Sequence, residues 1–306
     1  MLSFIIRRLL VAIPTLLILV TISFTLMHAA PGGPFTNERK VPEAVMKNIE
    51  AKYHLDQPLW KQYLYYLGDL VQGDLGPSFK YKDHTVNELI SSSFPRSAYI
   101  GVLSFVIVVL LGVGIGVVAA LNQNRWPDYA GMTFAMSGVM LPNFVLAPLC
   151  VMIFAVYLKW LPAGGWEGGR IEYLILPIVA MATSYVAQVA RITRGSMIET
   201  LNSTFIQRAR AKGLPRTHII LRHALKPAMI PVISYLGPAF VGIVTGSVVV
   251  DKVFSTGGIG QHFVNGAINR DYSLILGVTI LVGALTIFFN ALVDILYTVL
   301  DPRIRY

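Results

Sequence analysis

Charged residues are scarce in this sequence. Only 13% of its 306 residues are Asp, Glu, Lys or Arg, whereas a typical soluble domain carries about 25%. Apolar residues make up 55%, and the mean hydropathy is +0.62. Even large soluble domains leave much of their surface in water. The composition therefore argues against a soluble enzyme, a disordered chain and a disulfide scaffold, and it indicates a polytopic membrane protein.

Cysteine and the common catalytic motifs are equally scarce. Cys150 is the single cysteine, so an intrachain disulfide and a cysteine-based metal cluster are excluded. The sequence has no Gly-x-x-x-x-Gly-Lys-Ser/Thr loop, no His-Glu-x-x-His and no Gly-x-Ser-x-Gly. His218 and His223 are five residues apart, a poor spacing for one face of an α-helix. We expect no catalytic residues, no metal and no cofactor bound by this chain.

Long apolar runs are abundant. A spanning helix needs about 20 mostly apolar residues, and helices satisfy the backbone in lipid, whereas a β-barrel needs short alternating strands. The first run is too long for a signal peptide and is read as a retained anchor. The prediction is an all-α membrane protein with six transmembrane helices, none containing Asp, Glu, Lys or Arg: 9–30, 99–121, 129–158, 173–190, 228–250 and 272–293.

Basic residues predict the orientation. Six spans put both termini, 1–8 and 294–306, on one side of the membrane. The loops 122–128 and 191–227 lie on that same side. The loop 191–227 carries eight Lys or Arg residues against the single acid Glu199, and such an excess marks the cytoplasmic side. The prediction is therefore N-in and C-in. The net charge of +9 needs no nucleic-acid partner to explain it.

Three segments are expected outside: 31–98, 159–172 and 251–271. The first is long enough for a helical subdomain, because Pro42-Glu43 suits a helix start and a second apolar run opens at Pro58 and ends near Gly73. Its aromatic face either meets an external partner or packs on the spans. In the last segment, the glycine-rich stretch 254–260 is read as a tight turn rather than a phosphate loop.

Small residues within the spans predict close helix packing. Gly112, Gly114 and Gly116 cluster in one predicted span, and Gly242 and Gly246 form a Gly-x-x-x-Gly pair in another.

The cytoplasmic loop contains a start–stop pattern for a short helix. The stretch 204–207, Thr-Phe-Ile-Gln, fits a capping box, and Gly213 with Pro215 beyond it fits a stop. The pattern predicts a capped helix on the cytoplasmic face. Its apolar side holds Phe205, Ile206 and Ala209, and its basic side holds Arg208, Arg210 and Lys212.

This stretch resembles a known motif. Residues 207–213, Gln-Arg-Ala-Arg-Ala-Lys-Gly, are similar to the cytoplasmic Glu-Ala-Ala-x-x-x-Gly motif of binding-protein-dependent ABC importer permeases. Ala209 and Gly213 match, while Gln207 replaces the usual Glu and Arg208 the first Ala. Further similarity to the peptide-importer branch covers essentially the whole chain, in the stretches 53–58, 73–76, 221–227, 258–260, 269–272 and 301–306.

The resemblance implies a type I ABC importer permease fold and an inner-membrane subunit of a Gram-negative-type importer for peptides. It implies a second, C-type permease, two cytoplasmic ATPases that hold ATP and Mg, and a periplasmic peptide-binding protein, with membrane lipid around the spans. The short helix would enter a groove of an ATPase. The coupling residues that the resemblance implies are Gln207, Arg208, Ala209, Arg210, Lys212 and Gly213. It assigns no residue to the translocation pathway.

Alternatives stay open at this point. A permease for dipeptides, glutathione or nickel would share the same motifs. A self-contained channel or ion-driven carrier is the second class, but no Asp, Glu, Lys or Arg lies at mid-membrane depth, where proton-coupled carriers usually need one. An intramembrane enzyme would be the third, and the sequence offers it no catalytic constellation.

Overall fold

The protein is helical, as predicted. The computed structural model describes residues 2–29, 56–81 and 83–300. In that part of the chain the one β pairing outside helices is an isolated bridge between Pro77 and Thr85. The expected helix near Pro42 and the terminal stretch 301–306 lie outside the described residues.

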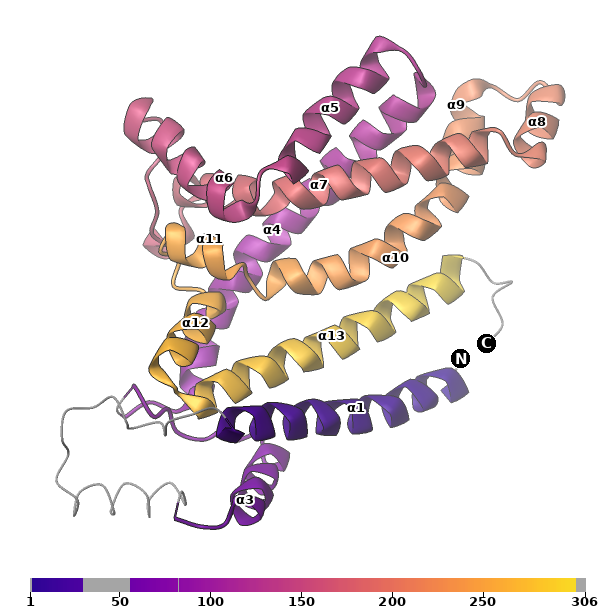
Figure 1. The fold of residues 1–306 in the computed structure, drawn as a ribbon. Helices are drawn as coiled ribbons and strands as arrows, with labels where there is room; N and C mark the ends of the chain where they lie inside the picture. Colours follow the sequence, from indigo (N-terminus) through magenta and orange to yellow (C-terminus); the bar gives the residue numbers. More distant parts are fainter. Residues whose placement is uncertain (1, 30–55, 82, 301–306) are drawn as a thin grey trace.

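Long helices dominate the architecture (Figure 1). In chain order the elements are α1 (Leu2–Ala29), α3 (Leu59–Val71), α4 (Val86–Leu121), α5 (Trp126–Met140), α6 (Asn143–Cys150), the π-helix η1 (Val151–Tyr157), the 3₁₀ turn η2 (Glu167–Gly169), α7 (Ile171–Leu201), α8 (Thr204–Ala211), α9 (Arg216–His218), the π-helix η3 (Ile219–Ala224), α10 (Leu225–Val244), α11 (Val248–Val253), α12 (Ile259–Asn269) and α13 (Tyr272–Leu300).

Within the described residues, five helical runs are long and apolar enough to cross a membrane, or six if one bent pair counts as a single span. The unbent runs are Leu10–Ala29, Val86–Leu121, Ile171–Leu201, Arg216–Val253 and Tyr272–Val293.

The bent pair occupies the predicted third span, 129–158. The chain bends by 102° between its two halves, so the expectation of one continuous helix there is wrong. Leu141 takes an extended conformation, and Pro142 is the N-cap residue of α6. A proline disfavours the helical conformation of the residue before it and cannot donate a backbone hydrogen bond, and this explains the break.

The predicted fifth span, 228–250, is interrupted as well. Gly246 has φ +81° and follows the end of α10, after which α11 begins at Val248. The Gly-x-x-x-Gly interpretation is therefore wrong for Gly246, which turns the chain. Gly242 does lie in a tight place, because a Cβ there would lie 2.9 Å from the Tyr185 hydroxyl oxygen.

α4 and α7 run well beyond their predicted limits. α4 starts at Val86 rather than near Tyr99, because Thr85 and Glu88 form a reciprocal capping box in which each backbone N–H donates to the other side chain at 3.2 Å. α7 continues to Leu201 instead of ending near Ala190. This helix therefore reaches directly into the basic segment 191–227.

α4 and α7 pack closely in the centre of the molecule. A Cβ on Gly112 would lie 2.7 Å from the Val189 side chain, and one on Gly116 would lie 2.5 Å from that of Thr193. The absence of side chains at these two positions lets the backbones approach, as predicted. Gly114 lies on another side of α4, where a Cβ would meet nothing within 4 Å.

The outer elements are fixed by specific polar contacts. In α3, the Tyr63 hydroxyl lies 2.5 Å from that of Thr21 on α1, while Trp60 stays 62% exposed. The turn before α12 is tight, as expected: the buried carboxylate of Asp251 accepts hydrogen bonds from the Thr256 hydroxyl at 2.5 Å and the Gly260 backbone N–H at 3.1 Å. The side chains of α3 thus both pack on a span and leave an exposed face.

Candidate coupling site

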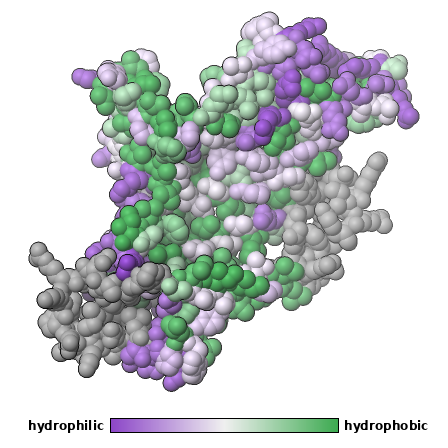
Figure 2. All heavy atoms as spheres, in the orientation of Figure 1, coloured by the Kyte–Doolittle hydropathy of each residue, from purple (hydrophilic) through white to green (hydrophobic). Residues whose placement is uncertain are grey.

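The short predicted helix exists and lies at one end of the molecule. Figure 1 shows α8 and α9 on the same side as the α4–α5 turn, the start of α1 and the end of α13. Hydrophilic residues gather over this end, around α8, whereas apolar residues cover much of the visible remainder (Figure 2). The arrangement suits a helix that projects from the ends of the spans.

The start of α8 differs from the expected capping box. Ser203, not Thr204, occupies the N-cap position, and no side chain caps the helix there. The Ser203 hydroxyl instead donates to the Thr200 carbonyl at the end of α7. The Gln207 side-chain amide donates to the Asn202 carbonyl at 3.3 Å. This hydrogen bond connects α8 to the residue that follows the end of α7. The ionised side chain of a glutamate at position 207 would have no N–H to donate to this carbonyl.

The end of α8 follows the prediction. Gly213 has φ +75°, its N–H donates to the Arg210 carbonyl at 2.9 Å, and the Leu214 N–H donates to the Ala209 carbonyl at 3.4 Å. These two bonds form a Schellman motif. The chain then reaches Pro215, which precedes α9.

One side of α8 packs on the spans. Ile206 is fully buried and Ala209 is 9% exposed, in a cluster with residues of α4, α7, η3 and α10 that includes Ala120 and Met197. Ala209 therefore faces its own chain. Its small size lets α8 lie close to the helix ends, and in this chain the residue is a packing position rather than an exposed contact.

The opposite side of α8 faces outward. Phe205, which the sequence pattern grouped with Ile206 and Ala209, is 45% exposed. Arg208 and Lys212 are also exposed, and positions 205, 208 and 212 share one face by helical spacing. We call these three residues the coupling face. Gln207, Arg210 and Gly213 are exposed beside it.

A buried ion pair connects this end of the molecule to the spans. The Arg194 Nε and Nη2 atoms lie 2.6 Å and 2.7 Å from the two carboxylate oxygens of Asp128, which is 1% exposed. The Asn124 N–H donates to the same carboxylate at 2.9 Å. The bidentate pair joins the start of α5 to α7, ten residues before α8 begins at Thr204. Sequence reasoning treated the two charges separately, although Asp128 is the one acid in the segment 122–128.

His218 and His223 lie close together, although their spacing of five residues is a poor one for a single face of an α-helix. His218 and His223 lie with ring centroids 5.4 Å apart, because the segment between them is the π-helix η3. A π-helix bonds residues five apart, so its turns bring such side chains together. Within the described residues, no group of three or more His, Cys, Asp or Glu side chains is arranged to hold a metal.

Comparison with known proteins places the chain in a family. Residues 112–306 match the family described as binding-protein-dependent transport system inner membrane component, and residues 1–100 match its N-terminal component. The oligopeptide transport system permease protein OppB of Salmonella typhimurium is 63% identical over the full length of both chains. The dipeptide permease DppB of Bacillus subtilis is 43% identical over 100% of this chain and 98% of its own.

The fold agrees with this match. A structure of the MetNI methionine ABC transporter in an inward-facing conformation aligns with a TM-score of 0.58 at 16% identity, over 70% of this chain and 96% of its own. The apolar helices and the matched family make this a multi-pass inner-membrane protein with the type I ABC importer permease fold, which works within a complex of several subunits. The chain belongs to the family of inner-membrane components of binding-protein-dependent transport systems.

Proposed function

We propose that the chain is the permease subunit of an ATP-driven importer for oligopeptides and forms half of its translocation pathway. The full-length identity of 63% to OppB supports the oligopeptide assignment. The dipeptide permease matches at the lower identity of 43%, so dipeptides are the secondary candidate.

The proposed orientation is N-in and C-in. Figure 1 shows the start of α1 and the end of α13 on the same side as α8. That side carries the basic loop 191–227, and an excess of Lys and Arg favours the cytoplasm.

In this proposal the partners are a second, C-type permease, two cytoplasmic ATPases and a periplasmic peptide-binding protein. ATP and Mg belong to the ATPases, and this chain contributes no enzymatic site, metal or cofactor of its own. The sequence supports this division because it contains no phosphate-loop motif.

The observation that carries the coupling role is the two-sided packing of α8. Its inward side joins a buried cluster with four other elements, while its coupling face presents Phe205, Arg208 and Lys212 to solvent. An ATPase that binds the coupling face and then moves would displace α8. The ends of α4, α7 and α10 that pack on α8 would move with it, because closely packed interiors transmit displacement. Alternating access follows if that displacement reorients α7 and α10.

Reconstitution tests this function. Proteoliposomes that contain the chain with the second permease, the ATPases and the binding protein should accumulate a labelled oligopeptide when ATP is inside with the ATPases. Vesicles with the chain alone should accumulate none. Uptake by the chain alone would instead establish a channel or carrier, and exclusive uptake of a dipeptide, glutathione or nickel by the complete system would reassign the substrate.

A further inference from the structure

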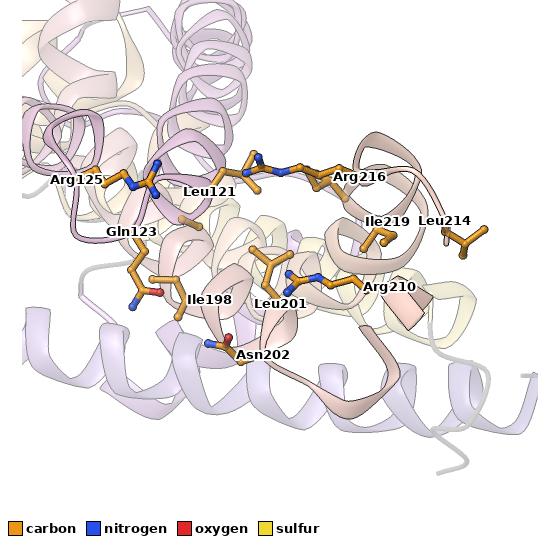
Figure 3. Close-up of a pocket in the computed structure, with 12 residues that line it drawn as sticks. Leu121, Gln123, Arg125, Ile198, Leu201, Asn202, Arg210, Leu214, Arg216 and Ile219 are labelled. Atoms are coloured by element: carbon orange, nitrogen blue, oxygen red, sulfur yellow. The ribbon is translucent and has the colours of Figure 1, made fainter. Parts of the chain in front are cut away.

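A pocket of about 590 Å³ lies beside α8, at the ends of α4 and α7 (Figure 3). Three arginines line it, each from a different segment: Arg125 from the α4–α5 turn, Arg210 from α8 and Arg216 from α9. Figure 3 shows the Arg216 side chain extending toward Leu121 and the Arg210 side chain toward Leu201. Distant parts of the sequence thus bring positive charge to one cavity.

The pocket contains no compensating acid. No Asp or Glu is among its lining residues. The ion pairs formed within the described chain join His84 to Glu88, Arg170 to Glu172 and Arg194 to Asp128, and so involve none of the three pocket arginines. Guanidinium groups that line one pocket without a carboxylate suit an anion with several acceptor oxygens, such as a phosphate.

Apolar side chains line the pocket as well. Leu121, Leu201 and Ile219 are among its lining residues, and Figure 3 shows Leu121 and Leu201 beside the ends of Arg216 and Arg210. A free phosphate would contact the arginines and leave these apolar side chains in water. A molecule with a phosphate group and an attached hydrocarbon chain would cover both, so the combination favours an amphiphile.

Residues typical of a membrane interface adjoin Arg125 in the sequence. The apolar run of α4 ends at Leu121, and Trp126 and Tyr129 follow with exposed fractions of 79% and 63%. Exposed Trp and Tyr side chains at the end of a spanning helix are typical of the headgroup region.

We propose that this pocket binds the phosphate headgroup of an anionic phospholipid from the cytoplasmic leaflet, with part of an acyl chain against the apolar lining residues Leu121, Leu201 and Ile219. Basic pockets between spanning helices on the cytoplasmic side are suited to such headgroups. The inference rests on the N-in orientation proposed above, and it does not require ATPase docking.

Lipid binding by the purified full-length chain tests the proposal. Native mass spectrometry would measure the affinity for phosphatidylglycerol and for phosphatidylcholine, with inorganic phosphate as a separate probe. Arg125→Gln and Arg216→Gln should each lower the affinity for phosphatidylglycerol about fivefold, the factor that one basic side chain contributes near an anionic surface. Affinity for phosphatidylcholine should stay unchanged.

Arg222→Gln is the matched control, because Arg222 is exposed in the same basic loop and does not line the pocket. An equal loss in Arg222→Gln would show general surface attraction and overturn the proposal. Inorganic phosphate that binds as tightly as phosphatidylglycerol would overturn the lipid assignment. So would an assembled importer in which Arg216→Cys cross-links to an ATPase while phosphatidylglycerol is expelled, since the pocket would then be a subunit interface.

These outcomes are separable from a failure of the proposed function. The lipid measurement contains no ATPase, so loss of ATPase docking does not change it. Conversely, a chain that binds no phosphatidylglycerol in this pocket can still support ATP-dependent peptide uptake.

Discussion

At the scale of single residues, Gly213 ends α8 in a left-handed conformation, φ +75°. Side chains with a Cβ are strained in this region, at a cost of about 1–2 kcal/mol. A Cβ at Gly213 would meet nothing within 4 Å, so the strain is conformational and not steric.

Substitution of Gly213 tests this reason for the helix end. Gly213→Ala should lower the free energy of unfolding in detergent by about 1 kcal/mol and weaken ATPase co-purification. Gly195→Ala is the control, because Gly195 is an exposed helical position that also has nothing within 4 Å. It should stabilise the chain by up to about 1 kcal/mol. The same sign of change in both variants, measured by chemical unfolding, would contradict the account.

The buried ion pair between Asp128 and Arg194 gives a second test at this scale. Arg194→Gln leaves the Asp128 carboxylate, 1% exposed, without its cation. Because the Arg194 side chain is 29% exposed, the expected loss of stability is that of an unpaired acceptor, about 1–3 kcal/mol. Arg191→Gln, on the exposed side of the same helix, should change stability by no more than about 0.5 kcal/mol. Thermal unfolding in detergent compares the two, and equal midpoints would show that the pair contributes little.

At the scale of the elements, hydrophobic runs predicted where the spans lie but not where they bend. Pro142 and Gly246 are visible in the sequence, yet apolar composition alone does not tell a tolerated proline or glycine from a break. A helix can continue through a proline in this chain, as α7 does at Pro177. Whether a helix breaks depends on neighbouring helices that re-satisfy the freed backbone groups.

Local signals explain the other differences between prediction and structure. The α4 start has a Thr-x-x-Glu signature at 85–88 that identifies a capping box and extends the helix beyond its apolar run. The π-helix η3 that joins His218 and His223 has no comparable signature. The glycine cluster 112–116, by contrast, predicted close helix packing, but it did not identify α7 as the partner or show that Gly114 lies on another side of α4.

That contact makes a prediction for the element scale. Gly116→Ala places a Cβ 2.5 Å from the Thr193 side chain, and overpacking of a close interface costs about 1–3 kcal/mol. Gly114→Ala, two residues away with nothing within 4 Å, should be neutral or slightly stabilising. Unfolding midpoints in detergent check the difference. If Gly114→Ala proves as damaging as Gly116→Ala, close α4–α7 packing is not the reason for the glycine.

At the scale of the whole molecule, the basic loop 191–227 carries the charge from which the orientation is proposed, and it also contains α8, the proposed coupling helix. The sequence predicted the existence, the end and the basic character of that helix. It did not predict that Ala209 packs inward while Phe205 points outward, because the choice depends on how α7 and η3 meet α8. The coupling face was therefore only partly identified before the structure.

Photo-crosslinking in the assembled importer tests the central claim most directly. A benzophenone amino acid would replace Phe205 or Arg208 on the coupling face, and in a control would replace Ile268, which is 70% exposed on α12. The account predicts ATPase adducts from positions 205 and 208 and none from position 268. Absence of ATPase adducts from both coupling-face positions, or equal adducts from position 268, would contradict it.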